Sequence, residues 1–291
     1  MKQSLESKRR VADRPTDRVL FVKALAFIGI GLATAGWAAV APADEIDAPF
    51  GGLSLGIHAG AFRGKSSYGT DPACPPIVVD AVFCNAAPDP TIANGNAVAA
   101  SGSGTMSSDG ATGGVQAGYN WQSGRIVYGG EIDFAALDFD ESASASGAFP
   151  VPFAGTQYTV TNKTTLHWVS TLRARVGATV TPQFLVYATG GAAFTRISVS
   201  GSYSDNANNG IVFGGSGSGE TSKLKAGWVI GAGAQWALDR QWSVKAEYLH
   251  ADFGSVSAAV PLTNSPAFTQ TISVTGDMTL DLLRVGLDYR F

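Results

Sequence analysis

The sequence predicts an all-β fold: an eight-stranded antiparallel up-and-down transmembrane β-barrel with short periplasmic turns and long extracellular loops. First, apolar residues recur at every second position in eight segments, as in strands whose two faces meet different environments. Second, the chain holds 36 Gly in 291 residues and only 15% charged residues, against about 25% charged in soluble domains. Third, very short and very long connections alternate along the chain.

Each of the first four segments carries one apolar face. In the clearest of them, residues 164–180, Leu166 and Trp168 face away from Arg173 and Arg175. The other three are 52–62 with Leu53, Leu55 and Ile57, 112–121 with Val115, Tyr119 and Trp121, and 126–140 with Ile126, Tyr128, Ile132 and Phe134.

The last four segments differ in clarity. Residues 184–199 have no clear phase, because small and apolar residues occupy both faces. The C-terminal segment alternates backwards from Phe291 and blurs at Asp281 and Leu282. The apolar faces are Leu224, Trp228, Ile230 and Trp236 in 222–238, Trp242, Val244, Ala246 and Tyr248 in 241–253, and Leu283, Val285, Leu287, Tyr289 and Phe291 in 277–291.

The connections predict how these strands are arranged. QSGR, TPQ and DRQ are short enough for tight turns, whereas the other connections are long, the first covering about residues 63–111. In an up-and-down barrel, alternate connections lie at the same end, so the short turns all face the periplasm. A soluble eight-stranded barrel is the alternative, but its apolar aromatics would overfill a small lumen. Aromatic girdles at the membrane interfaces are predicted from Trp121, Trp168, Trp236, Trp242, Tyr128 and Tyr289.

Residues 1–43 have the order of a secretory signal peptide. Residues 1–23 hold seven Lys or Arg against three acids, and an apolar run then ends in APA, whose last residue, Ala43, is the predicted cleavage site. A retained N-terminal anchor is the alternative, although a membrane helix needs about 20 apolar residues. The predicted mature protein, residues 44–291, is one acidic barrel domain, so nucleic acid is not an expected partner.

Cys74 and Cys84 lie in a Pro-rich stretch of the first long connection. In an oxidising compartment this pair predicts one loop disulfide. A metal site is the alternative, but no His lies nearby to complete it.

Charged residues occupy the other face of the predicted strands and would point into the lumen. An eight-stranded barrel has room inside for side chains and little else, and buried charges must be paired or hydrogen-bonded. We therefore predict an interior salt-bridge plug, with a narrow ion pathway as the alternative. The predicted inward charges are Glu131, Asp133, Arg173, Arg175, Lys225, Lys245, Glu247, Arg284, Asp288 and Arg290.

A catalytic site has little support in the sequence. Nucleophilic chemistry would need a His beside a Ser and a carboxylate, and the chain has His58, His167 and His250. His250 and Asp252 would share one face of a strand, but a nearby Ser means little in a Ser-rich chain. GAGAQW, residues 231–236, lacks the spacing of a nucleotide loop. We predict no enzyme, no metal and no cofactor.

Four blocks together resemble the small outer-membrane β-barrel family of alphaproteobacteria, also described as porin-family or OmpA-like membrane β-barrels. They are GGVQAGYNWQSGRIVYGGEIDF, TLRARVGATVTPQFLVYATGGAAF, GWVIGAGAQWALDRQWSVKAEYLHADFG and LLRVGLDYRF, and the resemblance spans about residues 50–291. It implies a surface-exposed outer-membrane protein that contributes to envelope integrity and to host or environment contact through its loops. The long first loop with its Cys pair departs from the simplest members, so loop-borne functions transfer poorly.

The resemblance also implies partners and alternatives. In such barrels the assembly machinery recognises the terminal strand, here with Leu287, Tyr289 and Phe291, and outer-membrane lipid and lipopolysaccharide surround the belt. A monomer is expected. The alternative functions are a small porin-like pore for ions or small solutes and loop-borne ligand binding such as haem binding. Candidate haem-binding residues on the predicted loops are Tyr68, Met106 and Tyr203.

Overall fold

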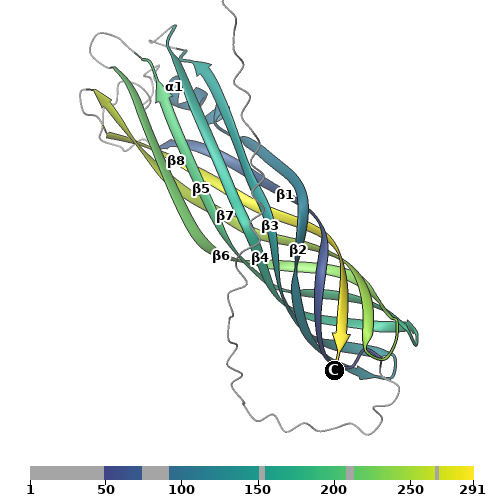
Figure 1. Ribbon diagram of the computed structural model, residues 1–291. Coiled ribbons are helices and arrows are strands. Elements are labelled where there is room, and N and C mark those ends of the chain that lie inside the picture. Colours follow the sequence, from purple (N-terminus) through teal and green to yellow (C-terminus); the bar gives the residue numbers. More distant parts are fainter. Residues whose placement is uncertain (1–48, 74–91, 151–154, 208–212, 266–268) are drawn as a thin grey trace, which may run out of the picture. The chain divides into compact units, whose positions relative to one another are not determined.

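The computed structural model describes residues 49–73, 92–150, 155–207, 213–265 and 269–291. In these residues eight strands form one sheet that closes on itself in the order β1 to β8 (Figure 1). The strands are β1 (Gly52–Ala73), β2 (Gly104–Ser123), β3 (Ile126–Ala148), β4 (Gln157–Thr181), β5 (Phe184–Asp205), β6 (Phe213–Ala237), β7 (Trp242–Ser265) and β8 (Thr269–Arg290), and a helix, α1 (Ile92–Ser101), precedes β2. Neighbouring strands are antiparallel, which confirms the predicted barrel. Among the described residues, no helix is long and apolar enough to cross a membrane.

The barrel closes where β8 pairs with β1. The register runs from Ser54 opposite Arg290 to Ala73 opposite Thr271. Closure leaves no free sheet edge, as lipid requires, because unpaired backbone groups cannot be hydrated there. Phe291 follows directly, and its backbone N–H donates to a carbonyl oxygen of β1 at 3.0 Å. The chain therefore ends at the rim of the barrel that carries the tight turns (Figure 1).

The strands are longer than the sequence predicted. They contain 20 to 25 residues, whereas a strand that crosses a bilayer needs about 9–11. The predicted loop over about 63–111 is wrong for residues 63–73 and 104–111, because β1 continues to Ala73 and β2 begins at Gly104, whereas residues 92–103 lie between these strands. Ser and Gly favour turns in isolation, but here pairing with a distant strand satisfies their backbone groups. Cross-strand hydroxyl pairs such as Ser144 and Thr161, 3.0 Å apart, add to this pairing.

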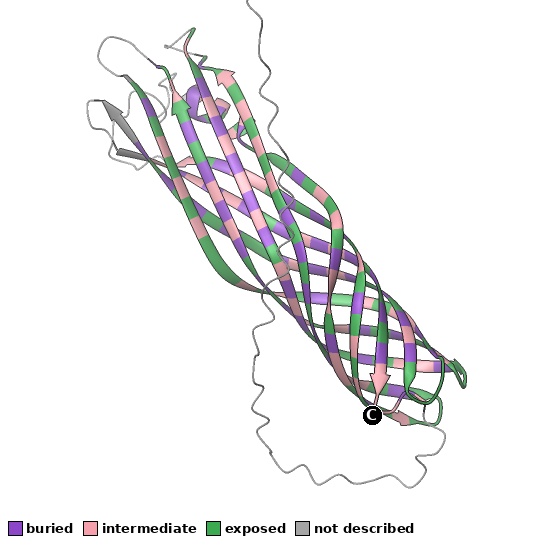
Figure 2. Ribbon diagram, in the orientation of Figure 1, coloured by how far each residue is buried: buried purple, intermediate pink, exposed green. Residues whose placement is uncertain are grey.

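Buried and exposed residues alternate along every strand (Figure 2). We divide the strands into two halves. The membrane half, at the end with the tight turns, consists of residues 52–61, 112–123, 126–136, 168–181, 184–195, 226–237, 242–251 and 281–290. The extracellular half consists of residues 62–73, 104–111, 137–148, 157–167, 196–205, 213–225, 252–265 and 269–280.

The chemistry of the two faces inverts between the halves. In the membrane half the outer face is apolar, with Ile57 62% and Leu283 64% exposed, and charged side chains are buried inside. In the extracellular half apolar side chains such as Phe139 and Ile197 are buried inside, and the outer face is rich in Ser, Thr and charged residues. Each half thus buries in the lumen the groups that its surroundings solvate poorly. These are charged groups where lipid surrounds the barrel and apolar groups where water does. The soluble-barrel alternative, in which apolar side chains face the lumen, describes only the extracellular half.

β-Bulges mark the border between the halves. Registers shift between Ala136 and Phe139, between Thr165 and Ser170, and between Asp252 and Ser255. In β4, Leu166 faces the lumen while Trp168 faces outward, because the bulge between them reverses the alternation. The prediction that these two residues share one face is therefore wrong. The blurred phase at Asp281 has another origin. Alternation continues there, but the buried residues change from a charged Arg284 to an apolar Leu282.

The extracellular half is packed across its own lumen. β5 lies against β7 and β8, and a Cβ added at Gly201 would lie 2.7 Å from Val274 Cγ2 and 3.1 Å from Val260 Cγ2. Val98 of α1 is fully buried in the same apolar core. The absence of a side chain at Gly201 therefore allows the opposite walls to meet.

The helix α1 is held in the extracellular mouth by polar side chains of the barrel wall. The Tyr158 hydroxyl donates to the Ala97 carbonyl oxygen at 2.9 Å. Thr70 Oγ1 and Asn162 Nδ2 donate to the Gly102 carbonyl oxygen at 2.7 Å and 2.9 Å. Carbonyl groups at a helix C-terminus lack intrahelical donors, so these bonds both satisfy the helix end and fix its position.

We expect Gly201→Leu to lower the free energy of unfolding by about 1–3 kcal/mol, because the new side chain overpacks the core between β5, β7 and β8. The control is Ser202→Leu, which adds the same side chain at the next position, on the outer face. Urea unfolding of both variants in lipid vesicles, followed by tryptophan fluorescence, measures the difference. Equal unfolding midpoints would contradict packing across the lumen.

Candidate functional site

The interior of the membrane half holds a cluster of charged side chains from β3, β4, β7 and β8, which we call the charge plug. None of its members is more than 6% exposed. Its carboxylates and its cations are equal in number, so the formal charges cancel. The members are Glu131, Asp133, Glu247 and Asp288, and Arg173, Arg175, Lys245 and Arg284.

Arg173 lies at the centre of the charge plug and binds carboxylates from two walls of the barrel. Its Nη2 donates to Glu131 Oε1 at 2.5 Å and to Asp133 Oδ2 at 2.8 Å. Its Nη1 donates to Glu247 Oε1 at 2.9 Å. The planar guanidinium offers donors in several directions at once, and one side chain therefore ties β4 to both β3 and β7.

Arg284 and Lys245 complete the ionic network. Arg284 Nη2 donates to Glu247 Oε2 at 2.6 Å and to Asp133 Oδ2 at 3.0 Å. Lys245 Nζ donates to Glu131 Oε2 at 2.7 Å. Each of these carboxylates accepts bonds from two cations, which compensates for its removal from water.

Tyr187 is a member of this site that the sequence did not reveal. Its hydroxyl donates to Glu247 Oε1 at 3.1 Å, and Arg175 lies over its ring, 3.8 Å from the centroid. The ring occupies space left by Gly233, where an added Cβ would lie 2.6 Å from Tyr187 Cζ, and at Gly177 an added Cβ would lie 2.6 Å from Tyr187 Cβ. Both glycines are register partners of Tyr187. The signal was hidden because segment 184–199 has no clear phase.

Neutral side chains extend the charge plug toward the periplasm. Gln116 Nε2 donates to Asp288 Oδ1 at 2.5 Å. Arg175 Nη2 donates to Gln235 Oε1 at 2.8 Å, and Gln235 Nε2 donates to the Ser243 hydroxyl at 2.8 Å. The polar network therefore runs through the lower lumen.

Two predicted inward charges lie outside the charge plug. Lys225 is at the border of the halves, where its Nζ donates to the Ser255 carbonyl oxygen at 2.8 Å. Arg290 lies at the periplasmic mouth and donates from Nε to the Arg240 carbonyl oxygen at 3.0 Å and from Nη1 to the Gly51 carbonyl oxygen at 3.1 Å. Both are half-buried rather than buried.

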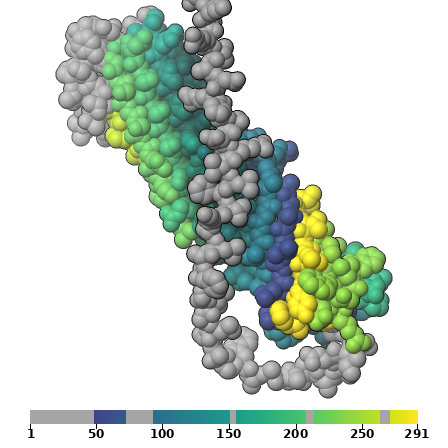
Figure 3. All heavy atoms as spheres, in the orientation of Figure 1, coloured from purple at the N-terminus to yellow at the C-terminus, as the bar shows by residue number. Residues whose placement is uncertain are grey.

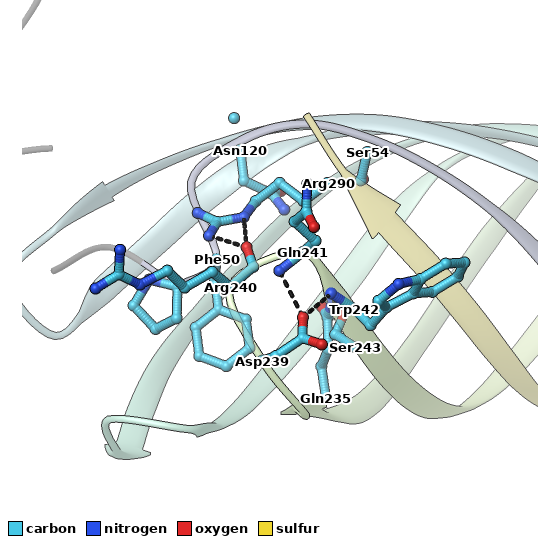
Figure 4. Close-up of a pocket in the computed structure, with 12 residues that line it drawn as sticks. Phe50, Ser54, Asn120, Gln235, Asp239, Arg240, Gln241, Trp242, Ser243 and Arg290 are labelled. Atoms are coloured by element: carbon cyan, nitrogen blue, oxygen red, sulfur yellow. Dashed lines mark hydrogen bonds between the residues drawn. The ribbon is translucent and has the colours of Figure 1, made fainter. Parts of the chain in front are cut away.

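A small polar pocket opens at the periplasmic mouth beside Arg290 (Figure 4). Asp239 organises its rim by accepting bonds from the backbone N–H groups of Trp242 and Gln241, each at 2.7 Å. These bonds lower the pKa of the Asp239 carboxyl below its usual range. Side chains of Phe50, Asn120 and Gln235 line the inner wall. Among these lining residues, Gln235 accepts a hydrogen bond from Arg175 of the charge plug at 2.8 Å.

The histidines do not assemble the catalytic arrangement considered from the sequence. His250 Nδ1 lies 2.7 Å from Asp281 Oδ1, a carboxylate that also accepts from the Tyr248 hydroxyl at 2.6 Å. The pairing partner of His250 is thus Asp281 on the neighbouring strand rather than Asp252. His58 faces the lumen, 3.5 Å from Arg284. Among the described residues, no group of three or more His, Cys, Asp or Glu could hold a metal ion.

The loop candidates for haem binding lie on strands instead. Tyr68 is in β1, Met106 in β2 and Tyr203 in β5. Met106 and Tyr203 are buried, and Tyr68 is half-buried. Their prediction as exposed loop residues is wrong, because the strands extend beyond the membrane. Cys74, Cys84 and Ala43 lie outside the described residues.

Aromatic side chains line the outer face at the periplasmic rim. Trp121 stacks on Tyr128 with ring centroids 5.7 Å apart, and Trp242 meets Tyr289 edge-on at 5.0 Å. Phe291 lies 5.0 Å from Tyr289 and is 71% exposed. Such belts are typical of membrane interfaces. At the opposite border, Trp168 stacks on Phe134 at 5.9 Å, and Trp228 is exposed.

Comparison with known proteins gives one consistent result. Residues 30–291 match the family model described as outer membrane protein beta-barrel domain. The chain is 34% identical over 192 residues to the 31 kDa outer-membrane immunogenic protein of Brucella melitensis, covering 66% of this chain and 70% of that protein. It is 31% identical over 141 residues to the 22 kDa outer membrane protein of Rhizobium leguminosarum, covering 48% and 52%. The solved structure of OprG from Pseudomonas aeruginosa aligns at 10% identity and a TM-score of 0.41, over 83% of this chain and 97% of that one.

We expect Arg173→Ala to lower the free energy of unfolding by about 3–5 kcal/mol, because it leaves buried carboxylates without their central cation. The matched control is Arg63→Ala, which breaks an exposed pair with Asp109 of 2.7 Å and is expected to change the free energy of unfolding little, because water screens exposed ion pairs. Urea unfolding in vesicles compares the two. If Arg173→Ala lowers the free energy of unfolding no more than the control does, the charge plug does not stabilise the barrel as expected.

Proposed function

This chain belongs to the outer-membrane β-barrel family, and on that premise we propose that it is a closed structural barrel that stabilises the envelope and meets the surroundings with its extracellular half. Its location is the bacterial outer membrane. The proposal separates two parts of the molecule: the membrane half anchors the protein, and the extracellular half carries the exposed surface.

The observation that carries this proposal is that the lumen is filled at two levels in series. The charge plug fills the membrane half with mutually neutralised side chains. Above it, the apolar core of the extracellular half is packed across the lumen, and α1 lies in the mouth. An ion would have to displace paired charges and then cross an apolar layer, where its loss of hydration is costly.

A small pore is the alternative function, and the polar lower lumen is the observation that favours it. The periplasmic pocket shares Gln235 with the polar network of the lower lumen, as the lower part of a pathway would. A pore would nevertheless need both layers to rearrange, because an eight-stranded barrel has room for little besides its own side chains. Closure at two levels supports a silent barrel over a conducting one.

We further propose that the protein is not an enzyme and binds no haem. His250 and Asp281 face outward at the border of the halves, beside Trp228 at 5.5 Å. Their side chains are 32% and 28% exposed, whereas a catalytic site usually lies in a cleft that excludes water. The side chains suggested for haem contact are taken up by strand packing. A test for lipid modification compares the mass of lipid A from cells with and without the protein. We expect the two masses to be the same.

Assembly and lipid partners follow from the outer-membrane setting. β8 closes the barrel on β1 and ends in Tyr289 and Phe291, which supports recognition of this strand by the barrel-assembly machinery. Lipopolysaccharide and phospholipid surround the apolar belt. A closed sheet offers no edge for a second copy to extend, which supports a monomer.

We expect the purified barrel to be silent in planar bilayers, with no unitary conductance steps, because both layers of the lumen block ions. The double variant R173A/R284A is expected to remain silent as well, since the apolar layer above the charge plug is unchanged. Heat-modified gel mobility of the same samples verifies that each barrel is folded. Discrete conductance steps from the wild-type protein would overturn the proposal of a closed barrel and favour the pore.

Deleting Phe291 should reduce the amount of folded barrel in the outer membrane severalfold, because the terminal aromatic residue is the proposed recognition element. The same deletion should change the unfolding midpoint of refolded protein little, since the side chain is mostly exposed. Phe291→Tyr, which keeps the ring, is the control. Normal outer-membrane levels of the truncated protein would count against this role.

A further inference from the structure

The three residues before β1, residues 49–51, lie in the periplasmic mouth of the barrel, and we call them the strap. Phe50 at its centre is only 3% exposed. This side chain belongs to a buried apolar cluster with residues of β3, β5 and β6. The other members of the cluster are Val127, Leu185, Tyr187 and Ala237. In the ring of eight strands β5 lies opposite β1, so the Phe50 side chain reaches across the mouth toward the far wall.

Two side chains of the rim hold the strap in this position. The Phe50 backbone N–H donates to Gln122 Oε1 of β2 at 3.1 Å. Arg290, the last residue of β8, donates from Nη1 to the Gly51 carbonyl oxygen at 3.1 Å and from Nε to the Arg240 carbonyl oxygen at 3.0 Å. Phe50, Arg240 and Arg290 line one pocket (Figure 4). One guanidinium therefore ties the strap to the turn between β6 and β7.

Two consecutive glycines join the strap to the barrel wall. Gly52, the first residue of β1, has a φ of 102°, in the region where a residue without a Cβ is at ease. Gly51 precedes it and is outside the strand. Glycine has more backbone freedom than any other residue, so the strap can swing out of the mouth while the paired part of β1 stays in the sheet.

Behind the strap, two buried polar atoms lie at one level of the lower lumen. Asn120 Oδ1 and Arg175 Nε have no hydrogen-bond partner among the described residues. Both residues are register partners of Gly129, which has no side chain to separate them, and Asn120 lines the same pocket as Phe50. Buried polar atoms without a protein partner are typically bonded to water, so this level of the lumen requires hydration.

Water reaches this level from the periplasmic side. Toward the other end of the barrel, the apolar core of the extracellular half fills the lumen, and polar molecules cross such a layer at a high cost in free energy. Toward the periplasm the strap is the barrier. Tyr187 links this barrier to the charge plug, because its ring belongs to the cluster around Phe50 and its hydroxyl donates to Glu247. The strap thus separates the periplasm from the polar network of the lower lumen.

We propose that the strap is a gate that opens the lower lumen to the periplasm as a blind, water-filled chamber. In the closed state Phe50 fills the slot between β3, β5 and β6. When the strap swings out about Gly51 and Gly52, water and small polar solutes reach Asn120, and the charge plug forms the inner end of the chamber. The gate rests on the proposed closed barrel, because a conducting lumen would have no inner end.

The test measures how fast a small charged methanethiosulfonate modifies the reporter variant S243C in refolded full-length protein. Ser243 is buried and lines the same pocket as Phe50, and C74S/C84S removes the natural thiols. Burial of a Phe side chain shifts an equilibrium by roughly 10- to 100-fold, so F50A should accelerate the modification by about that factor. The matched control F291A removes the same ring from the outer face of this rim, where it is 71% exposed, and should leave the rate unchanged.

A second reporter separates opening of the strap from loosening of the whole barrel. Ala258 lies in the apolar core of the extracellular half and is 1% exposed, so A258C should react equally slowly with and without F50A. Equal rates of S243C with and without F50A would overturn the gate, and so would an equal acceleration of A258C. Conductance steps from the wild-type protein would instead refute the closed barrel, so failure of the gate is distinguishable from failure of the proposed function.

Discussion

Every strand of this barrel alternates its side chains with a fixed period of two, yet crosses lipid in one half and water in the other. The lumen-facing positions must therefore be charged in one half and apolar in the next. The change occurs within single strands, as in β8, where buried Arg284 is followed toward the extracellular end by buried Leu282 and Leu280. The charge plug, the extracellular core and the position of the bulges all follow from this requirement.

Burial of so many charges is possible because they form one connected network. Arg173 and Arg284 share the carboxylates Asp133 and Glu247, so each charge is compensated by more than one partner. Glycines on the neighbouring strands leave the volume that the large side chains fill, as Gly177 and Gly233 do for Tyr187. Such a network links four strands at mid-membrane, where lipid itself offers no attraction between them.

A filled lumen transfers the functional surface to the outside of the molecule. The extracellular half extends the sheet beyond the lipid and holds α1 in its mouth, so its outer face is built from paired strands. The hydroxyl-rich outer face of β3 to β6 is a consequence of this extension.

The sequence alone determined the period-two alternation, the closed antiparallel order, the periplasmic turns and the inward phase of the charge-plug residues, because strand periodicity and turn length are local properties. It could not determine the strand ends, the reversal at Leu166 or the partner of His250, since each depends on pairing with residues far away in the chain. Strands outside the lipid are rich in polar residues, as loops are. Residues 63–73 were therefore predicted as part of a loop. Only the closed sheet, with its register between neighbouring strands, decided which charges meet and where Tyr187 lies.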